Sequence, residues 1–384
     1  MRWLVGSLLL TAVVSGLVGC GGDSSRRPIF GGPPPGATLA GWPKFMGTPA
    51  NTGRVDVANA GGQVRWKFRV NGLAGPAAIS PDGTVYFGIQ EIGSGLYAVD
   101  LASGAVKWSK PQFANFVGAP AIGSSGLLYV YLNNGLYAFN AQNGNQVWAQ
   151  AAIGSNTDGP AVGPDGTVYI GTAEPSIVAF DGRTGATLWD CSTGSSGSVV
   201  SCPALDGSGN VYAVQSDGSI VAVKAGRLLW KVQTNFVGHR TSITVGPNGL
   251  LYVIAGLNEF QALRADTGAQ VWSVPANSNN RGQVIGPDGT VYTSSLNPNA
   301  LIAYNPANGQ VLRSKPVLGN VGLHAMTNST LYVEANGGVT AYDAATFAAK
   351  WTIGTQGFIG GAVALAGDGT VVFPASDFYV YAVR

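Results

Sequence analysis

The sequence predicts an all-β fold, an eight-bladed β-propeller, from three observations. These are a regular repeat, turn residues that divide each repeat into four short strands, and a leading segment that matches only an outer strand. Eight copies of the repeat end 39 to 42 residues apart. Their last positions are Trp66, Trp108, Trp148, Trp189, Trp230, Trp272, Leu312 and Trp351. A period this regular indicates one supersecondary unit repeated along the chain.

The copy from Gly159 to Trp189 shows the content of one blade. Pro164-Asp165-Gly166 forms a turn, because proline presets φ and glycine accepts positive φ. The segments around it are short and rich in β-branched, aromatic or small residues, as strands are. The four strands are expected at 160–163, 167–170, 177–181 and 186–189.

Asp-Gly or Asn-Gly pairs recur before the second strand. They stand at Asp82-Gly83, Asp165-Gly166, Asn248-Gly249, Asp288-Gly289 and Asp368-Gly369. Calcium loops are one interpretation, but the multi-acid spacing of such loops is missing. Hairpin turns are the favoured interpretation.

The blade count follows from the two ends of the array. Inner strands are expected to start near Gly75, Gly118, Gly159, Val200, Arg240, Gly282, Gly322 and Gly360. The last set lacks a fourth strand, and the segment Gln63–Phe68 precedes any inner set. Pairing Gln63–Phe68 with the strand that ends at Val383 would close an eight-bladed ring and leave no open sheet edge between the first and last blades.

The end of each repeat resembles a known family. Ala98-Val-Asp100, Ser103-Gly104 and Trp108 match the tryptophan-docking pattern of pyrroloquinoline quinone (PQQ)-type propeller repeats. Three other copies match at the same spacing: Ala138–Trp148, Ala179–Trp189 and Ala262–Trp272. Three copies depart from it, namely Ala222–Trp230, which is shorter, Ala303–Leu312, which ends early on leucine, and Ala341–Trp351, which has Phe347 for the glycine. The opening Trp42-Pro43 and Asn51-Thr52-Gly53 also resemble the lead-in of this family.

The resemblance implies a packing role for the repeat tryptophans. Each ring is expected to wedge against the next blade, so the seven docking residues are Trp66, Trp108, Trp148, Trp189, Trp230, Trp272 and Trp351. Leu312 is expected to form the weakest joint of the ring.

The N-terminus predicts a lipoprotein signal over residues 1–19. Arg2 precedes an apolar run that is short for a membrane span, and the run ends in Leu17-Val18-Gly19-Cys20, which resembles a bacterial lipobox. This resemblance implies lipidation at Cys20, and Gly21 in place of aspartate implies delivery to the outer membrane with the propeller in the periplasm. Surface exposure and a plain secreted protein are the alternatives. Residues 20–41 then form the lipidated cysteine and a flexible tether, and 42–384 the propeller.

Composition and cysteine usage narrow the function. Charged residues make up 10% of the chain and the formal net charge is +2. The sequence therefore lacks the excess of positive charge that nucleic-acid binding requires. Cys191 and Cys202 form an even pair in an oxidising compartment, and the small residues between them favour a disulfide. Two buried thiols are the alternative.

The sequence offers little support for catalysis. PQQ-dependent dehydrogenases share the repeat, but the chain has no adjacent cysteine pair, no CxxCH haem motif and only two histidines. The resemblance therefore implies the non-catalytic branch, which includes the BamB subunit of the outer-membrane β-barrel assembly machinery. The expectation is a monomeric, lipid-anchored scaffold for envelope protein partners, without cofactor, metal or catalytic residues. A PQQ-dependent dehydrogenase or a ligand-binding propeller is the alternative.

One candidate binding site lies at the starts of the inner strands in blades five to seven. Its predicted members are His239, Arg240, Arg281, Gln283 and His324. Cations and amide donors gathered at one mouth of a propeller could bind an anion or an acidic peptide segment. Solvated loop residues are the alternative interpretation.

Overall fold

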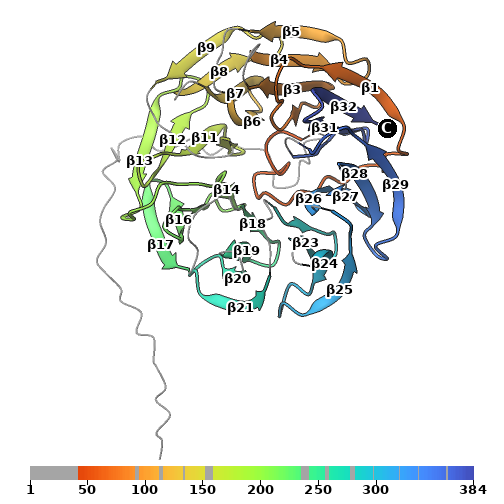
Figure 1. Cartoon of the computed structure of the whole chain (residues 1–384). Coiled ribbons are helices and arrows are strands. Elements are labelled where there is room, and N and C mark those ends of the chain that lie inside the picture. The colour runs from red at the N-terminus through yellow and green to blue at the C-terminus, as the bar shows by residue number, and fades with distance from the viewer. Residues whose placement is uncertain are drawn as a thin grey trace, which may run out of the picture.

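The computed structural model describes residues 42–90, 95–111, 116–132, 135–151, 159–234, 242–255, 259–276, 282–296, 298–319, 321–335, 337–359 and 362–384. All regular elements in these ranges are β-strands, and they form eight four-stranded antiparallel sheets. The sheets are arranged as blades around a common centre (Figure 1). The predicted all-β, eight-bladed propeller is confirmed.

The first four blades follow the chain from the inner to the outer strand. Blade 1 contains β2 (Ala78–Ile79), β3 (Thr84–Ile89), β4 (Gly95–Asp100) and β5 (Val106–Lys110). Blade 2 contains β6 (Phe116–Ile122), β7 (Leu127–Leu132), β8 (Gly135–Asn140) and β9 (Gln146–Gln150). Blade 3 contains β10 (Ala161–Val162), β11 (Thr167–Gly171), β12 (Ser176–Asp181) and β13 (Thr187–Ser192). Blade 4 contains β14 (Ala204–Leu205), β15 (Val211–Val214), β16 (Ser219–Lys224) and β17 (Arg227–Gln233).

The remaining blades repeat this order until the last. Blade 5 contains β18 (Ile243–Val245), β19 (Leu250–Ala255), β20 (Glu259–Arg264) and β21 (Gln270–Pro275). Blade 6 contains β22 (Val284–Ile285), β23 (Val291–Leu296), β24 (Asn299–Tyr304) and β25 (Val311–Pro316). Blade 7 contains β26 (Val321–Met326), β27 (Thr330–Ala335), β28 (Gly338–Asp343) and β29 (Ala349–Gly354). Blade 8 contains β30 (Ala364–Leu365), β31 (Val371–Ala375), β32 (Tyr379–Val383) and β1 (Val64–Arg69).

Strand β1 closes the ring as the sequence predicts. It pairs antiparallel with β32, placing Trp66 opposite Ala382 and Lys67 opposite Tyr381. Reciprocal backbone hydrogen bonds of 2.8 Å between Gln63 and Arg384 extend the pairing. The two ends of the propeller are thus held in one sheet.

The Asp-Gly pairs are hairpin turns. In four of them the aspartate Oδ1 accepts the backbone N–H two residues later: Asp82 from Thr84, Asp165 from Thr167, Asp288 from Thr290 and Asp368 from Thr370, at 2.8–3.1 Å. These side chains satisfy turn donors, which is the usual reason for aspartate at this position.

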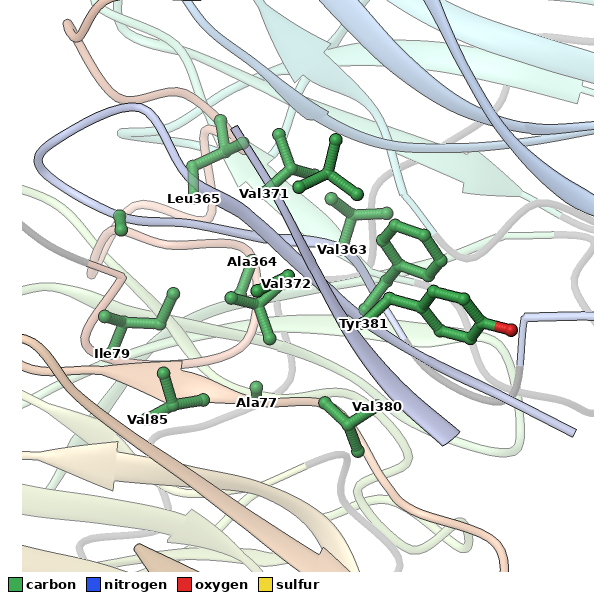
Figure 2. Packing of buried hydrophobic residues seen from close by; sticks show 14 of the residues in the cluster. Ala77, Ile79, Val85, Val363, Ala364, Leu365, Val371, Val372, Val380 and Tyr381 are labelled. Atoms are coloured by element: carbon green, nitrogen blue, oxygen red, sulfur yellow. The ribbon is translucent and has the colours of Figure 1, made fainter. Parts of the chain in front are cut away.

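The hydrophobic core lies between blades. Figure 2 shows one such layer, in which Ile79 and Val85 of blade 1 face Ala364, Val372 and Val380 of blade 8. The inner three strands of each blade are mostly buried, whereas outer strands such as β25 alternate between exposed and half-buried residues. Each blade is therefore stabilised chiefly by its two neighbours.

Candidate functional site: the blade joints and the ring centre

Each docking tryptophan lies opposite an alanine of its own blade and reaches into the next blade. Trp108, for example, pairs with Ala98, and its indole Nε1 donates to the Ala141 carbonyl of blade 2 at 2.9 Å. The Tyr86 hydroxyl of blade 1 donates to the same carbonyl at 3.0 Å. The two rings lie 5.9 Å apart, so one blade presents a paired aromatic contact to a single backbone acceptor of its neighbour.

A glycine in the next blade makes room for each tryptophan. At the joint between blades 2 and 3, Gly185 has φ +74°, and a Cβ there would lie 2.7 Å from the Trp148 ring. Both the conformation and the space exclude a larger side chain. The same contact joins Trp66 to Gly104, Trp108 to Gly144, Trp189 to Gly226, Trp230 to Gly268, Trp272 to Gly309 and Trp351 to Gly62.

The joint between blades 6 and 7 corrects the prediction for Leu312. The residue opposite Ala303 is Arg313, and Leu312 points outward with 52% of its surface exposed. Arg313 donates to the Ala344 carbonyl at 3.2 Å and lies over the Phe347 ring at 5.3 Å. Phe347 occupies the usual glycine position with φ +58° and is buried. An arginine-on-phenylalanine contact thus replaces tryptophan-on-glycine.

At the centre of the ring lies a segment that we call the N-terminal belt, residues 42–55. Its backbone carbonyls accept hydrogen bonds of 2.7–3.0 Å from the last residues of six inner strands. The pairs are Ile79 with Trp42, Ile122 with Pro43, Leu205 with Pro49, Val245 with Ala50, Ile285 with Thr52 and Met326 with Gly53. The orange trace in the middle of Figure 1 follows this path. The belt therefore holds blades 1, 2, 4, 5, 6 and 7 together where their inner strands end, next to the turns that lead into the second strands.

Several belt side chains are buried among the inner strands, and one of them is a lysine. Lys44 is 2% exposed, and its ammonium donates to the Asn51 side chain and to the Pro203 carbonyl at 3.3 Å. Asn51 in turn donates to the Ile243 carbonyl at 3.0 Å. Burial lowers the pKa of Lys44, and the adjacent Cys202 thiol opposes this shift. Sequence reasoning missed Lys44, although a lysine inside the apolar run from Trp42 to Met46 was a visible signal.

The structure does not contain the predicted disulfide. Cys191 and Cys202 are both buried thiols. Cys191 lies on the outer strand β13 and packs between blades 3 and 4, whereas Cys202 lies at the ring centre beside Lys44. The small residues between the two cysteines could form a closed loop. However, Cys191 lies on an outer strand and Cys202 near the ring centre, so a blade separates the two thiols.

The predicted mouth site is only partly within the described residues. His239, Arg240 and Arg281 lie outside them. Gln283 is fully buried, and its amide donates to the backbone carbonyls of Ser242 and Tyr252, which corrects its assignment as a binding group. His324 lies 3.3 Å from the carboxylate of Glu334, a residue that sequence reasoning did not include.

The potential metal-binding side chains are dispersed over the described residues. Over these residues, no group of three or more His, Cys, Asp or Glu side chains could hold a metal ion. The belt residues Phe45 and Met46 are buried at the centre in contact with inner-strand residues of several blades. These residues pack the belt against the ends of the inner strands.

Fold and joints together define the class: an eight-bladed propeller with docking repeats, closed by its own N-terminal strand. The family model described as outer membrane protein assembly factor BamB matches residues 51–225 and 216–319. The chain belongs to this PQQ-like repeat family. No curated protein matches the chain in sequence.

Solved structures share the fold at low identity. The BamB structure from Moraxella catarrhalis is 17% identical, with a TM-score of 0.61, covering 84% of this chain and 97% of that one. Quinohemoprotein alcohol dehydrogenase from Comamonas testosteroni is 16% identical, with a TM-score of 0.71, covering 90% and 81%. A europium-containing methanol dehydrogenase is 14% identical, with a TM-score of 0.70, covering 88% and 89%. The fold is therefore common to assembly factors and enzymes.

The predicted lipidation site, Cys20, and residues 1–41 lie outside the described residues. In the part of the chain that is described, no helix has the length and apolarity to cross a membrane.

Proposed function

We propose that the protein is a lipid-anchored, non-catalytic scaffold that binds protein partners in the bacterial envelope, in the assembly of outer-membrane proteins. In this proposal Cys20 carries the anchor and the propeller lies in the periplasm. The family match supports an envelope role of this kind.

The observation that carries the non-catalytic part is the belt. A cofactor or small-molecule site needs a concave, usually pre-formed space. Here Lys44, Phe45 and Met46 are buried at the axis, and Lys44 is held by Asn51 and Pro203. Backbone bonds to six blades fix the segment in place. Partner binding is then expected on the loops and rim.

The decisive experiment is crosslinking in intact membranes, followed by identification of the captured protein. A discrete envelope partner supports the scaffold. Reconstitution of the purified chain with PQQ and calcium tests the alternative, the dehydrogenase that the fold also admits. A saturable quinone absorbance band together with alcohol-dependent dye reduction would overturn the scaffold proposal.

The anchor is tested separately by Cys20→Ser, with the chain exported behind a cleavable secretory signal. Because the anchor and the propeller are separate modules, we expect the folded protein to move to the soluble periplasmic fraction at physiological ionic strength. Membrane retention equal to that of the parent would contradict the anchor.

A further inference from the structure

The charge on the outer rim of the ring is unevenly distributed. The eight outer strands hold ten lysines and arginines but one carboxylate, Asp190, so the rim is cationic although the chain is nearly neutral. Six of the ten cations stand on three consecutive strands: Lys350 on β29, Arg65, Lys67 and Arg69 on β1, and Lys107 and Lys110 on β5. We call these six residues the basic arc.

The basic arc lies on the outer strands of three neighbouring blades, and most of its side chains are exposed. Figure 1 shows β29, β1 and β5 following one another along one side of the rim, with β17 on the other side of the ring. Arg65, Lys67, Arg69, Lys107 and Lys350 are exposed, and Lys110 is half-buried. Its centre is β1, the strand that closes the ring, where every second residue is cationic.

Half of the basic arc lacks a carboxylate partner. Arg65 pairs with Asp368 at 3.1 Å, Lys107 with Asp100 at 3.7 Å and Lys350 with Asp343 at 3.2 Å. Among the described residues, Lys67, Arg69 and Lys110 have no ion pair. Lys67 lies over the Tyr381 ring at 4.8 Å. No described carboxylate neutralises the positive charge of these three side chains.

Apolar exposure does not distinguish this side from the rest of the rim. Nearly every outer strand exposes one valine or leucine by 41–52%: Val64, Val106, Val147, Leu188, Leu229, Val271, Val311 and Leu312. The apolar groups form an even ring, and only the charge selects one arc. A partner that recognises the arc must therefore be anionic, with shallow apolar contacts as a secondary contribution.

We propose that the basic arc binds the anionic phospholipid headgroups of the membrane to which the chain is tethered, which sets the propeller on its edge. This inference rests on the lipid anchor of the proposed function. The arc is the convex outer edge of a ring and offers no groove for a peptide, whereas an extended anionic surface can meet several neighbouring strands at once. A tether at residues 21–41 keeps the arc close to that surface, so weak contacts suffice.

The test is flotation with lipid vesicles, using the chain without residues 1–20, which keeps every described residue. Vesicles of phosphatidylcholine with and without phosphatidylglycerol are compared at low and high salt. We expect binding only with phosphatidylglycerol, and its loss at about 1 M salt, where the screening length falls to about 3 Å. Equal binding to both vesicles, or none to either, overturns the proposal.

Two charge-matched variants locate the surface. Lys67→Glu with Arg69→Glu on β1 is expected to reduce vesicle binding at least about tenfold, because each residue changes the surface charge by two units. Arg227→Glu with Lys231→Glu on β17 is the control across the ring, and it should bind as the parent does. Equal losses in both variants would mean that net charge alone acts and would overturn the arc.

A third variant distinguishes the loss of positive charge from a loss of folding. Lys67→Gln with Arg69→Gln removes both positive charges without adding negative ones, and it should show an intermediate loss with a parental unfolding midpoint. If vesicle binding fails while crosslinking still captures an envelope protein, the scaffold stands and the arc is wrong. If the protein binds an acidic peptide through the arc but binds no vesicles, the arc recognises a protein segment and the lipid proposal is overturned.

Discussion

Seven joints of the ring place tryptophan on glycine, and one places arginine on phenylalanine. In the regular joints the large ring comes from the outer strand and the next blade leaves space, as with Trp148 and Gly185. Between blades 6 and 7 the large ring, Phe347, comes from the turn and Arg313 covers it. The two solutions fill the same gap and reach the same type of carbonyl acceptor. The two joints thus share a filled volume and a donor to the neighbouring blade, although the residues differ.

The largest expected effect separates the two kinds of joint. Trp148→Ala should lower the free energy of unfolding by about 3–5 kcal/mol, because a buried aromatic ring and its hydrogen bond are lost. Arg313→Ala should cost about 1–2 kcal/mol, the sum of one hydrogen bond and one cation–π contact. Urea unfolding measures both. A Trp148→Ala loss below about 1 kcal/mol would contradict the docking role.

Exchanging the joint tests whether Arg313 and Phe347 act as a pair. Arg313→Trp alone sets an indole against the Phe347 side chain, and Phe347→Gly alone leaves Arg313 without its ring. The double variant recreates a regular joint, so we expect its loss of unfolding free energy to be about 2 kcal/mol smaller than the sum of the two single losses. Additive effects, within about 0.5 kcal/mol in a double-mutant cycle, would show that the two residues are independent.

Alkaline pH should weaken the regular joints through their tyrosines. Burial raises the pKa of Tyr169 to about 12, and the Asp165 carboxylate adds to the shift. The folded chain holds this proton more tightly, so the contribution of Tyr169 is complete below the unfolded pKa near 10 and is lost as pH rises towards about 12. Over this pH window the Tyr169→Phe variant should therefore lose less unfolding free energy than the parent, and the difference should be at most about 2 kcal/mol.

Tyr292→Phe is the matched variant at the sixth joint. Burial raises the pKa of Tyr292 as well, and Asp288 adds to the shift, but the Arg313 guanidinium opposes it. Its effect on the pH dependence should be smaller than that of Tyr169→Phe, measured by urea midpoints at several pH values. A larger effect at Tyr292 would mean that the arginine does not act on the joint.

The smallest effect is expected at Leu312. Because its side chain points away from the joint, Leu312→Ala should change the free energy of unfolding by no more than about 0.5 kcal/mol. A loss comparable to that of Arg313→Ala would restore Leu312 as the docking residue and contradict the strand register.

The fold was predictable because each repeat carries its turns and its docking ring in the sequence. The sixth joint was not, because leucine seemed the natural apolar substitute for tryptophan at position 312. Yet the sequence separation between Ala303 and Arg313 equals that between Ala98 and Trp108, and in each pair the two residues lie opposite each other in the sheet. Spacing, which the backbone fixes, was the better guide than residue type.

The ring centre could be predicted only in part. The belt acts through backbone carbonyls, which any residue possesses, so its contacts leave no pattern of side chains in the sequence. The disulfide prediction failed for a related reason. Separation along the chain indicates how easily a loop closes, but whether the cysteines meet depends on the blade that lies between them.

The belt and β1 also have a consequence for how the chain is made. Both belong to the first part of the propeller to be synthesised, yet β1 has no partner until β32, the last strand of the propeller, has been made. The belt likewise gains its contacts one blade at a time. A product truncated before Tyr379 therefore leaves β1 without its partner strand, and this exposed edge marks the unfinished chain.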